Sequence, residues 1–442
     1  MNMYDTEVAE GLLGHQGYQV VADALESESN SRNVSVDADV FLMNTCSVRE
    51  HAEERVYGRL GMLAKYKKAH PDLIIGLMGC MVEEHKEKLF KKYPHLDLMV
   101  GTRNIKELPG LIEEVRKGRR QVAKIRRDGI SIEYTDQIQR KGRFHAWLPV
   151  MTGCNKVCTF CIVPITRGPE VSMPARDVYR EAGRLVSEGV KWVTLLGQNV
   201  NSYTSHSSPV ASRSNSEFPA LLEMLCEIEG LERISFTTSH PQDATRELYE
   251  VIARNPKISR RFHLPLQSGA DPVLKRMKRL HTYAEYREKI DLMRALIPDI
   301  SVTTDIIAGF SGESEADHEA TCRALREIRY DGAYIYKYSL RPGTPASKLL
   351  DDVPIQIKEK RNAELLEIQK QIAAENSKRL IGRTVEVFVE DSNVQDSTQL
   401  YGRTPDEKKI VFKGETALLG RFQKVQIDKL VHDTLIGSLA KA

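Results

Sequence analysis

Residues 146–339 repeat one pattern six times: a short apolar run followed by an amphipathic segment with helical spacing. The apolar runs are AWLPVMT, WVTLLG, RISFTTS, RFHLPLQ, SVTTDIIAG and AYIYKYS. Segments such as ARDVYREAGRLVSEG and TYAEYREKIDLMRALI lie between them. Successive β–α units with right-handed crossovers build a parallel sheet that curls toward a barrel. This stretch therefore predicts a (β/α)6 barrel, complete or partial.

The flanking regions predict two other folds. Near the N-terminus, the buried runs DVFLMNT, LIIGLMG and LDLMVG alternate with amphipathic segments, which indicates an open α/β sheet domain. After a long amphipathic helix over 355–380, apolar residues recur at every second position, which predicts a small all-β barrel. The fold class is thus a multidomain α/β protein. The predicted segments are 1–115 (open α/β domain), 116–143 (basic linker), 144–378 (barrel core) and 379–442 (all-β barrel).

The composition fits a globular protein, since 41% of the 442 residues are hydrophobic and 28% are charged. No run approaches the ~20 apolar residues that cross a bilayer, and MNMYDTEVAE lacks an apolar signal core. We therefore expect no membrane association and a cytoplasmic location. The net charge of +3 is too small to establish a nucleic-acid partner.

The predicted linker 116–143 is strongly basic and has no clear periodicity. Two interpretations remain open for it. It is either a solvated linker or a strap that contacts the phosphates of a nucleic acid.

Three of the seven cysteines lie close together after the first barrel strand. Cys154, Cys158 and Cys161 form the pattern C-x3-C-x2-C. Structural zinc prefers four ligands, whereas three thiolates with no fourth Cys or His nearby suit a [4Fe–4S] cluster with one open iron. A zinc knuckle or three uncoordinated thiols are the alternatives.

The other four cysteines divide into two pairs. Cys46 and Cys80 each follow a predicted strand of the N-terminal domain, at the sheet edge where open α/β folds place their sites. Cys226 and Cys322 lie in helical patterns, which predicts buried packing residues.

The string CNKVCTFCIVPITRGPE resembles the radical S-adenosylmethionine (SAM) methylthiotransferases, whose members read CxxxCxxCIVPxTRGxE. The resemblance continues through LLGQNVNSY, FTTSHP, HLPLQSGADPVLKRM, TDIIAGFSGE and YKYSLRPGTPA. MNTCSVRE and GLMGCM are similar to the sulfur-inserting domain of that family, and YGRTPDEKKIVF is similar to its RNA-binding TRAM barrel. Within the family, the chain is most similar to the MiaB-type branch.

The resemblance implies an enzyme that methylthiolates carbon 2 of N6-isopentenyladenosine next to the anticodon of tRNA. Its cofactors would be two [4Fe–4S] clusters and SAM, which serves as radical source and as methyl donor. Its partners would be tRNA, a sulfur donor and a flavodoxin-like electron donor, and the chain would be a monomer. Alternative targets are threonylcarbamoyladenosine in tRNA or an aspartate of a ribosomal protein. A non-catalytic iron–sulfur protein that binds RNA is a further alternative.

The resemblance also assigns residues. The first cluster would be held by Cys154, Cys158 and Cys161. The SAM candidates, most of them at strand ends, are Phe160, Gln198, Asn199, Ser239, Gln267 and Asp305. The candidates for binding the substrate or RNA are Arg167, Arg341 and Arg403. Structural hydrogen bonds at the strand ends, and ordinary ion pairs of the arginines, are the alternatives.

The second cluster would be held by Cys46, Cys80 and a third cysteine. In the family that third cysteine stands in a string like YGCQMN, and Met1-Asn2 are in register with the residues just after it. The resemblance therefore implies a translation start upstream of Met1. A paralogue that lacks one cluster ligand is the alternative.

Overall fold

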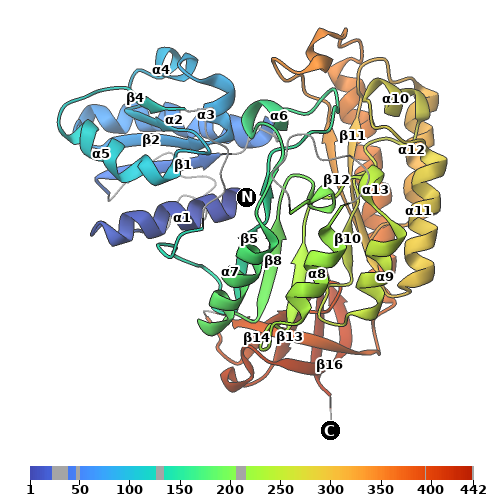
Figure 1. Cartoon of the computed structure of the whole chain (residues 1–442). Helices are drawn as coiled ribbons and strands as arrows, with labels where there is room; N and C mark the ends of the chain where they lie inside the picture. Colours follow the sequence, from blue (N-terminus) through green and yellow to red (C-terminus); the bar gives the residue numbers. More distant parts are fainter. Residues whose placement is uncertain (22–37, 46–49, 126–133, 206–215, 394, 441–442) are drawn as a thin grey trace. The chain divides into compact units, whose positions relative to one another are not determined.

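The computed structural model describes residues 1–21, 38–45, 50–125, 134–205, 216–393 and 395–440 (Figure 1). Its contacts divide the chain into two compact units. The first unit comprises Met1–Lys141, Thr152–Asn155 and Cys161–Val171. The second comprises Gly142–Met151, Lys156–Phe160 and Ser172–Ala442. Within the described ranges, no helix has the length and apolar character that a membrane span requires.

The first unit is built on a parallel four-stranded sheet with the order β1-β2-β3-β4. Both faces of the sheet are covered, since the successive residues Ile74 and Ile75 of β2 belong to two different apolar clusters. This arrangement confirms the predicted open α/β domain. Its elements are α1 (Asn2–His15), β1 (Val40–Thr45), α2 (Glu50–Ala69), β2 (Ile74–Gly79), α3 (Cys80–His85), α4 (Lys88–Lys92), β3 (Leu98–Val100), η2 (Ile105–Glu107), α5 (Leu108–Arg116), β4 (Val122–Lys124) and α6 (Val163–Thr166).

Two details of this unit differ from the sequence-based expectation. The amphipathic segment between LIIGLMG and LDLMVG forms two short helices, α3 and α4, instead of one, because Lys86 between them has a positive φ of 47°. The basic segment 116–143, predicted as a linker, contributes the edge strand β4, which pairs with β3. Only Val122 of β4 is buried, so no apolar run marks this strand in the sequence.

The second unit contains all six predicted barrel strands. They form two parallel three-stranded sheets, β5-β8-β9 and β10-β11-β12, so the expected barrel is partial. The short strands β6 (Met151–Thr152) and β7 (Val171–Ser172) each stand at a chain position where the first unit and the second unit meet in sequence. The other elements up to the C-terminal barrel are β5 (His145–Pro149), α7 (Ala175–Ser187), β8 (Trp192–Leu196), η3 (Val200–Ser202), α8 (Phe218–Cys226), β9 (Arg233–Phe236), η4 (Pro241–Asp243), α9 (Arg246–Arg254), β10 (Arg261–His263), α10 (Asp271–Arg276), α11 (Tyr283–Leu296), β11 (Ser301–Ala308), α12 (Glu315–Ile328), β12 (Gly332–Lys337), η5 (Pro345–Lys348) and α13 (Ile355–Lys378).

The helices of this unit follow the local sequence signals closely. On α7, Val178, Ala182 and Leu185 are buried at helical spacing. α12 begins with a capping box, in which Ser314 and Asp317 satisfy each other's backbone N–H groups. The short helix α10 was not predicted, although its Asp-Pro start is typical of a helix N-terminus.

The C-terminal residues form a closed five-stranded barrel with the order β13-β14-β15-β17-β16, as predicted. Val387 and Val389 lie inside it. Phe388, which alternates with them, points away from this core but is also fully buried, because it packs against Trp192 and Phe422. The barrel elements are β13 (Thr384–Ser392), β14 (Gln399–Arg403), β15 (Lys409–Lys413), η6 (Thr416–Leu418), β16 (Phe422–Val431) and β17 (Thr434–Leu439).

The C-terminal barrel packs against the amino ends of the parallel strands (Figure 1). Arg233, the first residue of β9, donates to the backbone carbonyl of Thr404 at 3.0 Å. Arg261, the first residue of β10, pairs with Glu407 at 2.9 Å. At the carboxyl ends, Lys156 of the cysteine loop pairs with Asp243, which also accepts a hydrogen bond from Asn199 after β8. Within this unit, the C-terminal barrel and the Lys156–Phe160 segment therefore lie at opposite ends of the strands.

Candidate functional site

The cysteine loop begins at a glycine that the local structure requires. Gly153 has a positive φ of 77°, and a Cβ at this position would lie 1.9 Å from the carbonyl oxygen of Pro169. The backbone N–H of Cys154 donates to the carbonyl of Gly168 at 3.1 Å. Cys154 and Cys161 are half-buried residues of the first unit, whereas Cys158 is a half-buried residue of the second. The trio as one ligand set remains a prediction.

In the second unit, Cys158 lies beside two nitrogen donors. Nη1 of Arg279 donates to its sulfur at 3.3 Å, and Nε2 of His240 lies 4.0 Å from the same sulfur. Nδ1 of His240 accepts from the backbone N–H of Gln242, so the neutral ring carries its proton on Nε2, on the side of the cysteine. Donors around a sulfur stabilise a thiolate, which is the form that binds metal. Cys158 therefore fits the role of a cluster ligand.

Burial and charge keep His240 neutral. Burial lowers its pKa, and the positive charges of Arg279 and Lys156 lower it further, to well below the usual value for histidine. The guanidinium of Arg279 is itself fixed, because Nη2 donates to the carbonyl of Pro265 at 2.7 Å. The site thus presents one permanent cation and one neutral imidazole to the sulfur of Cys158.

The residue after Cys158 anchors the loop. The backbone N–H of Thr159 donates to the carbonyl of Met277 at 3.0 Å, and its hydroxyl donates to the carbonyl of Arg276 at 3.0 Å. Phe160 packs edge-on against Phe310 in an apolar cluster. Phe160 therefore contributes to the packing that supports the loop.

Three of the predicted SAM residues carry buried polar atoms with no hydrogen-bond partner among the described residues. These atoms are Oδ1 of Asn199, Oγ of Ser239 and Oε1 of Gln267. They follow β8, β9 and β10, all at the carboxyl edge of the strands. An unsatisfied buried polar group costs about 1–3 kcal/mol, so three at one edge favour a polar ligand that completes them. SAM offers an amino group and ribose hydroxyls as donors to the two amide oxygens, and its carboxylate can accept from the hydroxyl of Ser239.

The remaining SAM candidates have less specific surroundings. Gln198 is half-buried beside Asn199. Asp305 lies on β11, where its Oδ2 is 3.4 Å from Nε2 of His263.

The predicted substrate-binding arginines lie in different surroundings. Arg167 is only 5% exposed and pairs with Asp5 of α1 at 2.6 Å. This ion pair is the structural alternative to a contact with substrate or RNA, and the substrate-binding role of Arg167 stays a prediction. Arg341 is buried at 8% exposure. Arg403 is partly exposed and pairs with Glu390 at 3.0 Å.

Of the two cysteines predicted for a second cluster, Cys80 is described and Cys46 lies outside the described residues. Cys80 is the first residue of α3 and is buried. It contacts Arg167: burial of this guanidinium acts to lower its pKa, but Asp5 and Cys80 outweigh burial and raise the pKa above its usual value. A buried cation beside the sulfur suits a thiolate ligand at Cys80.

The basic segment 116–143, which was interpreted as either a linker or a strap, contains several paired cations. Several of its cations form ion pairs within the first unit, which reduces the charge available to a nucleic acid. The pairs are Arg116–Glu113, Arg119–Glu114, Lys124–Glu107 and Lys141–Glu10. Residues 126–133 of the strap lie outside the described residues.

Sequence patterns missed Arg279 and His240 as neighbours of Cys158. Both stand in or next to strings that carry the family resemblance, since His240 belongs to FTTSHP and Arg279 follows HLPLQSGADPVLKRM by two residues. Their position in or next to these strings could have marked both residues as candidates for the site. The sequence alone did not show that either residue lies next to the sulfur of Cys158.

Three family descriptions match parts of the chain. The radical SAM superfamily matches residues 148–325, the uncharacterized protein family UPF0004 matches residues 1–101, and the TRAM domain matches residues 378–440.

Curated proteins named tRNA-2-methylthio-N(6)-dimethylallyladenosine synthase are similar over nearly the whole chain. The chain is 40% identical over 439 residues to the one from Clostridium botulinum (strain Langeland), covering 99% of this chain and 94% of that protein. It is 40% identical over 440 residues to the one from Pelotomaculum thermopropionicum, covering 98% of this chain and 94% of that protein.

Among solved structures, the chain is similar to the radical SAM methyltransferase TsrM from Kitasatospora setae, solved with cobalamin and a [4Fe–4S] cluster bound. The TM-score is 0.54 with 14% sequence identity, covering 78% of this chain and 70% of that chain. This likeness supports the fold.

Proposed function

The chain belongs to the family of the tRNA-2-methylthio-N(6)-dimethylallyladenosine synthases, and we propose that it methylthiolates carbon 2 of N6-dimethylallyladenosine (N6-isopentenyladenosine) in tRNA. The proposal rests on the carboxyl edge of the strands in the second unit. There the sulfur of Cys158 lies beside fixed donors, and three buried oxygens have no hydrogen-bond partner among the described residues. The name shared by these relatives favours this nucleoside over threonylcarbamoyladenosine or a ribosomal aspartate.

The chemistry of the reaction explains why such an edge is needed. Carbon 2 of adenine bears an unactivated C–H bond, which no general base of the protein removes. When bound, a [4Fe–4S] cluster and SAM supply the radical reactivity that this bond requires. In the proposal, Cys154, Cys158 and Cys161 hold the cluster. Arg279 and His240 stabilise the sulfur of Cys158, and the backbone bonds of Thr159 fix the loop.

We assign the orientation of SAM to the polar strand ends. Asn199, Ser239 and Gln267 direct their unpartnered oxygens to the polar groups of SAM. Gln198 and Asp305 are further candidates at the same edge. Residues on rigid strands position a ligand more accurately than residues on loops.

The proposal assigns sulfur insertion to the first unit. Cys46 and Cys80 would contribute ligands to a second [4Fe–4S] cluster, and Arg167 would balance the charge of the Cys80 sulfur. A sulfur donor and a flavodoxin-like electron donor would supply the sulfur and the electrons. We further propose that the enzyme works as a monomer in the cytoplasm, where its tRNA substrate is available.

The test uses the full chain, reconstituted anaerobically, with tRNA that carries the unmodified N6-dimethylallyladenosine. Expected products are 5′-deoxyadenosine and the 2-methylthio nucleoside, both detected by mass spectrometry. Replacing Cys154, Cys158 and Cys161 together by Ala should abolish both products, whereas Cys226→Ala on α8 should change neither. Formation of 5′-deoxyadenosine by the triple variant would refute the assignment of the cluster ligands.

A further inference from the structure

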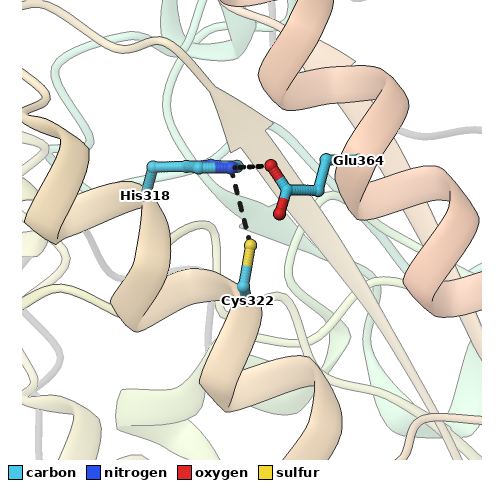
Figure 2. A group of neighbouring side chains, drawn as sticks. All are labelled: His318, Cys322 and Glu364. Carbon is cyan, nitrogen blue, oxygen red and sulfur yellow. Dashed lines mark hydrogen bonds and ion pairs between the residues drawn. The ribbon is translucent and has the colours of Figure 1, made fainter.

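Three side chains capable of binding a metal meet between α12 and α13, away from the cysteine loop. His318 and Cys322 stand four residues apart on α12, and Glu364 projects toward them from α13 (Figure 2). The imidazole Nε2, the thiol sulfur and one carboxylate oxygen all lie within 4.8 Å of one another. Nothing in the proposed methylthiolation uses these residues.

The distances between the three atoms match a tetrahedral zinc site. Nε2 of His318 lies 3.5 Å from Sγ of Cys322 and 3.0 Å from Oε2 of Glu364. Bonds of about 2.3 Å to sulfur and about 2.0–2.1 Å to nitrogen and oxygen, at tetrahedral angles, separate N from S by ~3.5 Å and N from O by ~3.3 Å. The side chains are therefore already close to the positions of metal ligands.

Hydrogen bonds among the three side chains do not satisfy all three of the facing atoms. The same atom, Nε2 of His318, faces both the sulfur and the carboxylate oxygen (Figure 2). In a neutral ring, Nε2 is either a donor or an acceptor. As a donor it has one hydrogen for two partners, and as an acceptor it faces the lone pairs of the carboxylate. A cation between the three atoms would satisfy all of them at once.

The site is buried on one side and open on the other. His318 is 3% exposed and Cys322 is fully buried. The side chain of Glu364 is 43% exposed, which provides a path for an ion and room for a water ligand. Ion pairs such as Arg361–Glu315 and Arg329–Glu375 hold α12 and α13 together around it. The ligand positions therefore rest on two helices whose spacing is fixed independently.

We propose that His318, Cys322 and Glu364 bind one zinc ion, with water as the fourth ligand. Binding would deprotonate the thiol and release its proton to the solvent. The mixed set of sulfur, nitrogen and oxygen donors suits zinc, whereas magnesium and calcium prefer oxygen ligands. The ion would join α12 of the strand–helix repeat to α13, the helix that leads into the C-terminal barrel.

The test measures zinc on the full chain after anaerobic reconstitution, so that iron occupies the cluster cysteines. We expect one zinc per chain by elemental analysis. X-ray absorption at the zinc edge should report one sulfur at about 2.3 Å and nitrogen or oxygen ligands at about 2.0–2.2 Å. Glu364→Gln, which changes a partly exposed side chain, and Cys322→Ala should each weaken zinc binding at least ~10-fold.

Two matched variants serve as controls. Glu367→Gln alters another exposed glutamate of α13, and Cys226→Ala removes another helical cysteine, so both should bind zinc like the unaltered chain. Equal zinc affinity in Glu364→Gln and the unaltered chain would overturn the proposal. A zinc coordination shell with no sulfur ligand would also overturn the proposal. A shell with several sulfur ligands would overturn it too, because it would place the ion on the cluster cysteines. Because Glu364→Gln leaves the buried residues unchanged, the test does not depend on the folding of Cys322→Ala.

Discussion

The guanidinium of Arg279 lies 3.3 Å from the sulfur of Cys158, although the two residues are 121 positions apart in the sequence. Arg279 is 4% exposed and is held by the carbonyl of Pro265. A buried cation that donates directly to a thiolate favours the more negative state of any cluster bound there. The arginine is therefore a positioning and charge-balancing residue of the proposed cluster site.

The first prediction concerns the reduction potential of that cluster. Arg279→Met removes the cation and the hydrogen bond, so the potential should become more negative by about 60 mV, a tenfold change for one electron. Spectroscopic redox titration of the reconstituted chain measures it. Lys275→Met removes an exposed cation of nearby α10 and should leave the potential unchanged. An unaltered potential in Arg279→Met would show that Arg279 only supports the fold.

The second prediction is that Ser239 contributes to SAM binding but not to the stability of the folded chain. The Ser239 hydroxyl has no partner among the described residues, so Ser239→Ala should leave the ligand-free chain as stable or slightly more stable. The SAM dissociation constant should rise about tenfold, which corresponds to ~1.4 kcal/mol. Calorimetry and thermal unfolding measure the two effects.

Ser268 provides the matched control for this prediction. Its hydroxyl accepts from the backbone N–H of Ala270 at 3.2 Å and lies 3.3 Å from the hydroxyl of Thr321. Ser268→Ala should therefore lower the melting temperature without changing SAM affinity. The assignment of Ser239 fails if the two variants show the same pattern.

The third prediction concerns the buried ion pair of the first unit. Asp5→Asn leaves the guanidinium of Arg167 buried beside a neutral amide, which should destabilise the unit by about 3–5 kcal/mol. Glu10→Gln breaks the more exposed pair with Lys141 and should cost less than about 1 kcal/mol. Urea unfolding of both variants measures the difference. Equal losses would mean that burial does not strengthen the Asp5–Arg167 pair.

A fourth prediction links pH to the docking of the C-terminal barrel. Burial acts to raise the pKa of Glu407, but Arg261 and hydrogen bonds from Ser235 and Ser259 outweigh it, and the pKa falls below its usual value. A lowered carboxyl pKa stabilises the fold above the pKa of the unfolded chain, and this stabilisation is lost as the pH falls through the folded-state pKa. Glu407→Gln should therefore cost about 2 kcal/mol at pH 7 and progressively less below about pH 4.5.

Urea unfolding at pH 7 and at pH 4 tests this linkage. Glu415→Gln changes an exposed glutamate of the same barrel and should cost less than about 0.5 kcal/mol at either pH. A Glu407→Gln penalty that stays constant between the two pH values would contradict the expected proton linkage.

The fifth prediction concerns tRNA. Removing the C-terminal barrel would expose Trp192, so point variants are the better probe. Lys424 and Lys429 are exposed on β16. If each contacts a phosphate, Lys424→Gln with Lys429→Gln should reduce the salt dependence of tRNA affinity by about 1.4–1.8 in log–log slope. Filter binding over a salt series measures it, and Lys360→Gln on α13 should have no effect. An unchanged slope would show that these two lysines do not contact the phosphates of tRNA.

Much of the fold was predictable because its strands and helices have long, regular patterns. The six barrel strands and the alternation of Val385, Val387 and Val389 belong to such patterns. β4 was missed, because only one of its three residues, Val122, is buried and no apolar run marks the strand. Phe388 alternates with the valines of β13 and is also buried, because a second surface that includes Trp192, far away in the sequence, covers it.

Residues of the candidate site were predictable only where they lie close together in the sequence. The motif of Cys154, Cys158 and Cys161 is local, so its pattern alone predicts a shared site. Arg167 belongs to the same string, yet its partner Asp5 is 162 residues away, and no local pattern reports that contact. The pair of His318 and Cys322 is visible at helical spacing, but Glu364 comes from another helix 46 residues beyond His318.

Because the C-terminal barrel lies at the amino ends of the strands, the second unit can distinguish long RNA substrates from short ones. The eight residues of β11 span roughly 26 Å, and the proposed chemistry takes place beyond their carboxyl ends. A single nucleoside or short oligonucleotide reaches that edge without touching the barrel. A folded RNA that reaches both ends gains affinity from two separated contacts, so substrate choice would depend on the three-dimensional extent of the RNA as well as on the reacting base.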